Sequence, residues 1–187
     1  NQSGSNFDCV VPVSGAKDSY FIVDLLKNKL GLNPLLVTFN KLYNTRLGIQ
    51  NLAYLRTQFD CDHLQMSPDP NVCKRIVKET LRHRGSIYWH CIAGYTSFPV
   101  RIAEKFRIPL IIWGAHQGVD QVGMFSHLDE VEMSERYRLE HDLMSLDPTD
   151  LLGGPENLSI QEMEPFLYPS AERIAEIGIR GIYLNNY

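Results

Sequence analysis

The loop from residue 14 to residue 19 holds the side chains in this sequence that are best suited to chemistry. It contains two hydroxyls, Ser14 and Ser19, a cation at Lys17 and a carboxylate at Asp18. The loop follows Phe7–Val13, an apolar and β-branched run typical of a buried parallel strand, and it precedes a predicted helix. The N–H groups at the start of a helix and the helix dipole both attract anions. The pattern therefore predicts a phosphate-binding turn.

The carboxylate of Asp18 is unusual in such a turn because it repels phosphate. A Mg²⁺ ion bridging Asp18 and the phosphate oxygens removes this conflict, and the arrangement suits pyrophosphate held as a leaving group. The loop matches neither GxxxxGKS/T nor GxGxxG, which argues against a Walker ATPase and a Rossmann dehydrogenase. The alternative interpretation is an ordinary strand-to-helix turn in which a serine caps the helix.

Alternating strand-like and helix-like segments position this loop. Strands are predicted at residues 7–13, 35–39, 63–66 and 109–114, and helices up to residue 30, from residue 44 or 45 to 59, over 72–81 and up to residue 106. Strands that alternate with helices favour βαβ units with right-handed crossovers. We therefore expect an α/β fold with a doubly wound parallel sheet.

The strand signals stop after Gly123. Residues 128–144 are charged with a helical period, Ser159–Glu162 fits a capping box, and a last helix is predicted from Ser170 to Gly178. We expect residues 1–123 to form the sheet domain and residues 124–187 to form an all-helical extension. The polar start and the apolar last residues predict a fragment of a longer protein.

Composition narrows the class of protein. The 187 residues suffice for one domain with a core, and 44% hydrophobic and 21% charged residues are ordinary for a soluble protein. The net charge of −4 gives no basic surface for nucleic acid, and no apolar run is long enough for a membrane helix. The four cysteines are widely spaced, which favours reduced thiols in a cytoplasmic protein.

The segment Val13–Ser19, with the sequence VSGAKDS, resembles the SGGxDS PP-loop of the N-type ATP pyrophosphatases. That group includes GMP synthetase, asparagine synthetase and tRNA thiolation enzymes. Within it, the chain resembles the N-acetyl sugar amidotransferases of surface-polysaccharide and nonulosonic-acid pathways. The segments that carry this second likeness are residues 30–39, 89–94, 105–114, 137–143 and 181–184. The PP-loop is specific to the superfamily, and the later segments choose the branch.

The resemblance implies a sheet of the adenine nucleotide α-hydrolase type and a reaction that uses ATP and Mg²⁺. ATP would adenylylate the acetamido oxygen of an N-acetyl sugar, release pyrophosphate, and leave AMP to be displaced by ammonia. The ammonia would come from a separate glutaminase subunit, and a homo-oligomer stays open. The protein itself would contribute positioning and charge neutralisation around the phosphates.

The resemblance also assigns roles to residues. Lys17, Asp18 and Ser19 would be catalytic, with Asp18 as the metal ligand. The nucleotide would be bound by Ser14, Gly15, Ala16, Lys17, Asp18, Ser19, Thr38, Phe39, Asn40, Trp113 and Gly114. The sugar would be bound by His90, Cys91, Gly94 and Tyr95.

Four positions depart from the family pattern. Ala16 replaces the second loop glycine and would strain the loop if that position needed a positive φ. Asn40 and Ala115 stand where acidic residues are usual, which favours an altered substrate or weakened catalysis. Tyr88 replaces the first cysteine of a Cys-x-x-Cys pair, which argues against a zinc site at Cys91.

Several alternatives follow from the sequence. The chain could be another PP-loop enzyme, such as a tRNA-modifying or sulfur-transfer ATPase, an ATP-binding module without catalysis, or a scaffold in a larger complex. A nucleophile–base pair at His90 and Cys91 is less favoured than a packed loop. The charged residues between Glu130 and Glu140, Arg138 included, predict a solvated helix face, and Cys9 is predicted to lie in the core. His116 and His127 are predicted to be surface or structural residues.

Overall fold

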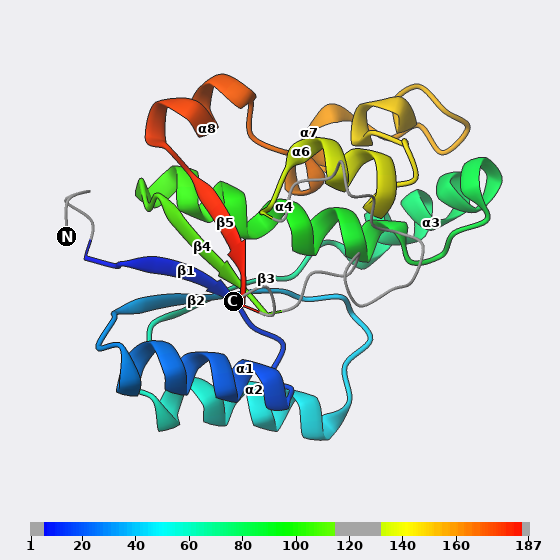
Figure 1. The fold of residues 1–187 in the computed structure, drawn as a ribbon. Coiled ribbons are helices and arrows are strands. Elements are labelled where there is room, and N and C mark those ends of the chain that lie inside the picture. Colours follow the sequence, from blue (N-terminus) through cyan, green and yellow to red (C-terminus); the bar gives the residue numbers. More distant parts are fainter. Residues whose placement is uncertain (1–5, 115–131, 185–187) are drawn as a thin grey trace.

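Five parallel strands form a single sheet in the order β3-β2-β1-β4-β5 (Figure 1). The structure is a computed structural model, and it describes residues 6–114 and 132–184. The strands are β1 (Cys9–Pro12), β2 (Pro34–Phe39), β3 (His63–Met66), β4 (Leu110–Trp113) and β5 (Arg180–Tyr183). Each strand pairs in parallel with its neighbour. The predicted doubly wound α/β fold is therefore confirmed.

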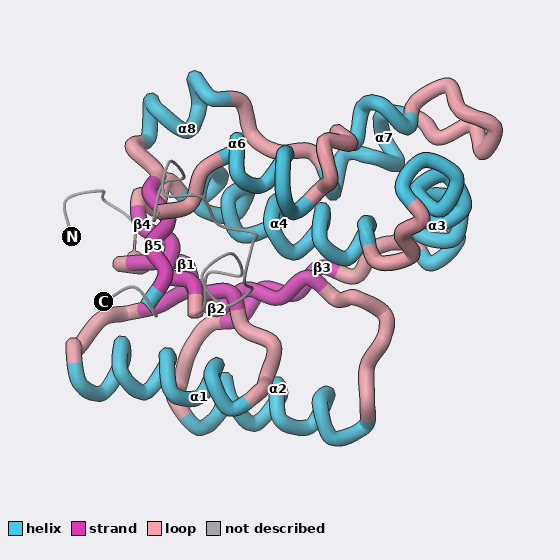
Figure 2. The backbone as a smooth tube through the Cα atoms, turned by 45° about the vertical axis from the view of Figure 1, so that its right-hand side comes forward, coloured by secondary structure: helices cyan, strands magenta, loops and turns pink. Residues whose placement is uncertain are grey.

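Helices cover both faces of the sheet (Figures 1 and 2). One face carries α1 (Lys17–Asp24), its π-helical continuation η1 (Leu25–Lys29) and α2 (Arg46–Gln58). The other carries α3 (Pro70–Arg84) and α4 (Trp89–Phe106). The C-terminal part adds α6 (Glu135–Tyr137), η2 (Arg138–Asp142), η3 (Pro148–Leu151), α7 (Ile160–Met163), η4 (Glu164–Phe166) and α8 (Ala171–Ile177). This part is helical, as the sequence predicts, up to residue 177.

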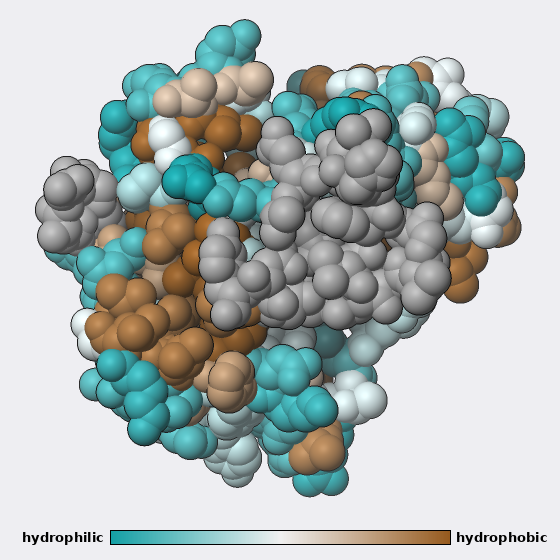
Figure 3. Space-filling model, in the orientation of Figure 1, coloured by the Kyte–Doolittle hydropathy of each residue, from teal (hydrophilic) through white to brown (hydrophobic). Residues whose placement is uncertain are grey.

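The alternation of side chains along the strands builds two hydrophobic clusters, one on each face. Val10 belongs to the cluster beneath α3 and α4, whereas Cys9 and Val11 belong to the cluster above α1 and α2. Cys9 is fully buried, as predicted. Leu110 and Ile182 pack against the cluster above α1 and α2 and remain half-buried. Apolar surface gathers on the left of the view in Figure 3.

Local capping signals in the sequence set the helix ends. The Thr45 side chain accepts a hydrogen bond from the Gly48 N–H at 3.0 Å, so α2 begins where the sequence predicts. Ser159 and Glu162 form the predicted capping box of α7. Gly178 ends α8 with a φ of 72°. These caps fix one end each of α2, α7 and α8.

Three predictions are wrong. Residues 180–183 form strand β5 rather than part of an all-helical extension, and they pair with Leu110–Trp113. His90 and Cys91 lie in the first turn of α4, not in a loop. Arg138 is only 4% exposed and is not on a solvated face.

The predicted domain boundary at residues 123 and 124 lies outside the described residues, as do Ala115, His116, His127 and Glu130. None of the helices in residues 6–114 and 132–184 combines the length and the apolar character needed to cross a bilayer.

Candidate functional site

A cleft of about 620 Å³ opens at the carboxyl ends of the strands. Its volume is within the range of about 300–1,000 Å³ that is usual for small-molecule sites. It lies between the loop after β1 and the end of β4. The strand order of the sheet reverses between these two strands. Crevices at such switch points are the usual ligand sites of open α/β sheets.

The cleft brings together most of the predicted nucleotide-binding residues. Of the predicted site residues, those that line it are Ser14, Asp18, Ser19, Thr38, Phe39, Asn40, Tyr95, Trp113 and Gly114. Gly15, Ala16, Lys17, His90, Cys91 and Gly94 do not line it. The predicted residues thus divide into those that line the cleft and those that do not.

The loop after β1 is held by its own two serines. The Ser14 N–H donates to Ser19 Oγ at 3.0 Å, and the Ala16 N–H donates to Ser14 Oγ at 3.4 Å. Gly15 has a φ of 77°, and a Cβ there would lie 2.8 Å from the Leu52 backbone nitrogen. Ala16 is extended, with φ −77° and ψ 171°. Glycine is therefore needed at position 15, and alanine at position 16 causes no strain.

The first turn of α1 offers hydrogen-bond donors to a ligand. Its N-cap is Ala16, and no side chain caps the helix. The Ser19 N–H donates to the Ala16 carbonyl oxygen at 3.0 Å, whereas the N–H groups before it have no partner within the helix. The helix dipole adds a partial positive charge there. Ser14 precedes this turn and Asp18 lies within it; both are exposed, whereas Ser19 is buried. The turn can therefore bind an anion, with Asp18 placed next to it.

Thr38 is fixed at the end of β2 by two hydrogen bonds. Its hydroxyl donates to the Val13 carbonyl oxygen at 2.6 Å, so it can only accept from His63 Nε2 at 3.0 Å. Burial, reinforced by the charge of Arg56, lowers the pKa of His63, which keeps the imidazole neutral at pH 7 with its proton on Nε2. This chain of bonds joins the three strands that form one wall of the cleft.

Asn40 organises the turn that follows β2. Its Oδ1 accepts from the Leu42 N–H at 2.9 Å and from Asn44 Nδ2 at 2.7 Å, while its Nδ2 donates to Ser67 Oγ at 3.0 Å. The amide thus donates and accepts at the same time. Its first role in the structure is to shape the cleft wall.

The charge of the cleft differs in sign from that of the whole chain. Among the cleft-lining residues that the structure describes, Asp18 is the one carboxylate, and Lys41 and Arg56 are cations. The chain as a whole carries −4. The Lys41 Nζ lies 4.5 Å from the centre of the Tyr95 ring, which holds this cation at the cleft. A locally positive cleft favours a polyanionic ligand.

Comparison with known proteins gives limited similarity. No protein-family model matches the chain. A stretch of 68 residues is 31% identical to an uncharacterized protein of Methanocaldococcus jannaschii, covering 36% of this chain and 24% of that protein. The chain thus spans about a quarter of the length of this curated relative.

Solved structures with a similar chain path include two synthetases. NMN synthetase from Francisella tularensis has 17% identity and a TM-score of 0.47, with 95% of this chain and 85% of that chain covered. The NH3-dependent NAD synthetase from Campylobacter jejuni has 11% identity and a TM-score of 0.49, with 94% and 83% covered. At these scores the likeness is loose, and the fold assignment rests on the strand order and register of this sheet.

Three of the four predicted sugar-binding residues are buried behind the cleft. His90 is 2% exposed and Cys91 is fully buried, with 3.4 Å between His90 Nε2 and Cys91 Sγ. Burial raises the pKa of the Cys91 thiol to about 11, so it stays protonated and is a poor nucleophile. A Cβ on Gly94 would lie 2.2 Å from the Phe39 ring. Tyr95 alone of the four lines the cleft.

Sequence reasoning missed several cleft residues. These are chiefly Lys41, Tyr43, Arg56, His63, Gln65 and Tyr88. The period-two spacing of His63 and Gln65 on β3 is a signal that could have placed both on one side of the strand. Tyr43 and Tyr88 stack with ring centres 5.5 Å apart at 18°, a contact between distant segments that no local pattern reveals.

In residues 6–114 and 132–184, no group of three or more His, Cys, Asp or Glu side chains could hold a metal ion by itself. Mg²⁺ does not need such a group, because it is commonly held by one or two carboxylates together with substrate phosphates and water. Asp18 beside the anion-binding turn fits that pattern.

Proposed function

We propose that the cleft binds ATP with its phosphates at the Ser14–Ser19 loop. The observation that carries this proposal is the positively charged cleft at the switch point, with uncapped N–H groups at the start of α1 and Asp18 as the one carboxylate among its described residues. Nucleotide phosphates are the polyanions for which such helix starts are suited. The cleft volume of about 620 Å³ also suits a nucleotide.

The roles of the cleft residues follow from their places. Ser14 and the first N–H groups of α1 would bind phosphate oxygens, and Asp18 is the residue that would hold Mg²⁺. Mg²⁺ held there would supply neutralisation of the negative charge on the pyrophosphate leaving group. Thr38 and Phe39 contact the nucleoside, and Trp113 borders the opposite side.

The proposed reaction is the adenylylation of an oxygen on a second substrate. A carbonyl oxygen of that substrate attacks the α-phosphorus, and the bond to pyrophosphate breaks. In the finer form of the proposal the carbonyl belongs to the acetamido group of an N-acetyl sugar. Ammonia from a separate glutaminase subunit then adds to the activated carbon, and AMP leaves with the oxygen to give an acetamidino group.

Binding and catalysis are tested separately. Titration calorimetry with ATP should show binding to the wild type and at least tenfold weaker binding to Gly15→Ala, because the added Cβ meets Leu52 and the φ of 77° is strained. Gly153→Ala is the matched control, since its φ is 73° but no atom lies within 4 Å of the added Cβ. Equal ATP affinity in Gly15→Ala and Gly153→Ala would contradict the phosphate site.

Catalysis is measured as release of pyrophosphate and formation of AMP from ATP with ammonium and an N-acetyl sugar. Asp18→Asn should lower the rate at least tenfold, because it removes the carboxylate that holds the metal. An unchanged rate in Asp18→Asn would exclude the metal role.

A second function, ATP binding without turnover, is favoured by one observation: Lys17, predicted to be catalytic, is exposed and does not line the cleft. ATP binding without any AMP formation would support this second function.

A further inference from the structure

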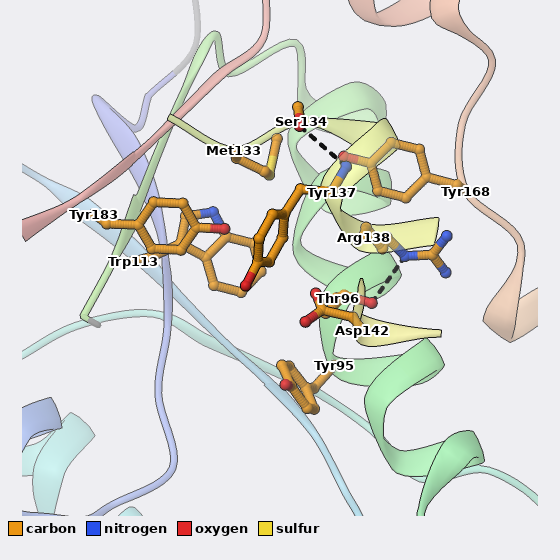
Figure 4. Close-up of a pocket in the computed structure, with 10 residues that line it drawn as sticks. All are labelled: Tyr95, Thr96, Trp113, Met133, Ser134, Tyr137, Arg138, Asp142, Tyr168 and Tyr183. Carbon is orange, nitrogen blue, oxygen red and sulfur yellow. Dashed lines mark hydrogen bonds between the residues drawn. The ribbon is translucent and has the colours of Figure 1, made fainter. Parts of the chain in front are cut away.

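A second, smaller cavity of about 60 Å³ adjoins the cleft (Figure 4). Tyr95 and Trp113 line both cavities, so they form the wall between them. We call the smaller one the tyrosine pocket; its residues are Tyr95, Thr96, Trp113, Met133, Ser134, Tyr137, Arg138, Asp142, Tyr168 and Tyr183. On the same volume scale, a cavity needs about 10–15 Å³ to hold one water molecule. A pocket of about 60 Å³ therefore has room for part of one ring and is too small for a nucleotide.

Asp142 supplies the one carboxylate among the residues that line the tyrosine pocket, and the buried Trp113 Nε1 there also has no hydrogen-bond partner among the described residues. Its carboxylate points into the pocket, on the side of Tyr137 and Tyr183 (Figure 4). No hydrogen bond or ion pair joins Asp142 to another residue in the described part of the chain. Burial raises the pKa of this carboxyl to about 6, against the opposing charges of Arg138 and His141. Asp142 is half-buried, so its carboxylate is partly withdrawn from water without gaining donors, and a ligand that donates hydrogen bonds would relieve that cost.

Arg138 does not meet this need, because its Nε and Nη2 donate to other residues. Its Nε donates to Thr96 Oγ1 at 2.8 Å, and its Nη2 donates to the Phe166 carbonyl oxygen at 3.2 Å. Its guanidinium carbon lies 4.7 Å from the centre of the Tyr168 ring. Arg138 therefore lines the pocket but makes its hydrogen bonds to groups other than Asp142. It offsets the charge of Asp142, so the pocket does not select a cation.

The walls of the tyrosine pocket are aromatic and carry hydroxyls. Trp113 and Tyr183 stack with ring centres 6.1 Å apart at 28°. Together with Tyr95, Tyr137 and Tyr168 they give flat apolar surface for the C–H face of a ring. A carboxylate that accepts hydrogen bonds, set among aromatic faces and near electrical neutrality, recognises an uncharged ring with hydroxyl groups.

We propose that the tyrosine pocket binds a hydroxyl-bearing ring of the second substrate, with Asp142 accepting hydrogen bonds from the ring hydroxyls and the aromatic walls packing on its face. This inference rests on the proposed function, since it supplies the acceptor for ATP bound in the cleft. The shared wall of Tyr95 and Trp113 places the acceptor beside the end of β4, next to the strand that carries the phosphate loop.

The test uses N-acetylglucosamine as the probe and saturation-transfer NMR as the readout, with ethylammonium as a cationic comparison. The wild type should bind the sugar, and Asp142→Ala should weaken sugar binding at least tenfold, since hydrogen bonds to charged groups contribute about 1.5–3 kcal/mol. Tyr183→Phe, which keeps the ring, gives a second variant. Glu140→Gln is the matched control, because Glu140 lies on the same segment but pairs with Arg136 at the surface.

ATP affinity is measured in the same proteins by calorimetry. Sugar binding that is lost in Asp142→Ala while ATP affinity stays unchanged supports the pocket. Three results overturn it: no sugar binding by the wild type, equal sugar binding in Asp142→Ala, or preference for ethylammonium over the sugar. Failure of the wild type to bind ATP would instead contradict the proposed function of the cleft.

Discussion

Replacing Asp142 by asparagine is expected to stabilise the folded protein at neutral pH. Burial raises the pKa of this carboxyl from 3.8 to about 6. The folded state therefore binds the proton more tightly than the unfolded state, and stability falls as pH rises through the window from about 4 to about 6. The gap of about two pH units corresponds to about 3 kcal/mol, which the charged form costs above pH 6. The neutral asparagine carries no such cost.

Urea unfolding of wild type and Asp142→Asn at half-unit steps from pH 4 to pH 8 measures this effect. The two proteins should be nearly equal at pH 4, and the asparagine variant should be more stable by about 2–3 kcal/mol at pH 7.5. Taking the difference between the two proteins removes the titration of other groups. Glu140→Gln should change stability by less than about 0.5 kcal/mol at every pH, because its surface ion pair is exposed. A constant difference across the range, or a less stable Asp142→Asn at pH 7.5, would refute the reasoning.

Two further predictions concern the cleft wall and the thiols. Gly94→Ala should destabilise the protein by about 1–3 kcal/mol in urea unfolding, because the added Cβ lies 2.2 Å from the Phe39 ring. The same variant should weaken ATP binding. Unchanged stability would show that α4 and β2 pack less closely than the structure has them. Burial raises the pKa values of Cys73 and Cys91 to about 11 and also raises the pKa of Cys61, but the Cys61 thiol is only half-buried and therefore accessible to a reagent. Alkylation at pH 7.5 followed by mass spectrometry should therefore label Cys61 at least tenfold faster than the other two, and equal labelling of Cys91 would contradict its burial.

The sequence predicted the parts of the molecule whose signals are local. The run before Ser14 and the helix after it place the loop correctly, because a buried strand followed by a polar turn needs no distant partner to be recognised. The start of α2 at Thr45 and the capping box at Ser159 are of the same kind. Most residues predicted to bind the nucleotide line the cleft, because the carboxyl ends of parallel strands meet at one edge of the sheet.

The features that the sequence did not predict depend on distant contacts. Strand β5 has four residues, one of them Gly181, and it is a strand because β4 offers a free edge for pairing. Arg138 stands in a charged run that suggests a solvated face, yet Thr96 and Phe166 supply acceptors that allow its burial. The tyrosine pocket likewise combines residues from α4, the end of β4, the C-terminal helices and β5, so no window of sequence contains it.

Asn40 shows why a departure from a family pattern need not weaken a site. A carboxylate in its place could still accept from the Leu42 N–H, but it could not donate to Ser67 as the amide does at 3.0 Å. It would also place a second negative charge in a cleft where, among the described lining residues, Asp18 is the one carboxylate. Because phosphate binding depends on a positive local field, the neutral amide favours the nucleotide as well as the turn. The charge that Asp18 adds is then the one that Mg²⁺ can neutralise.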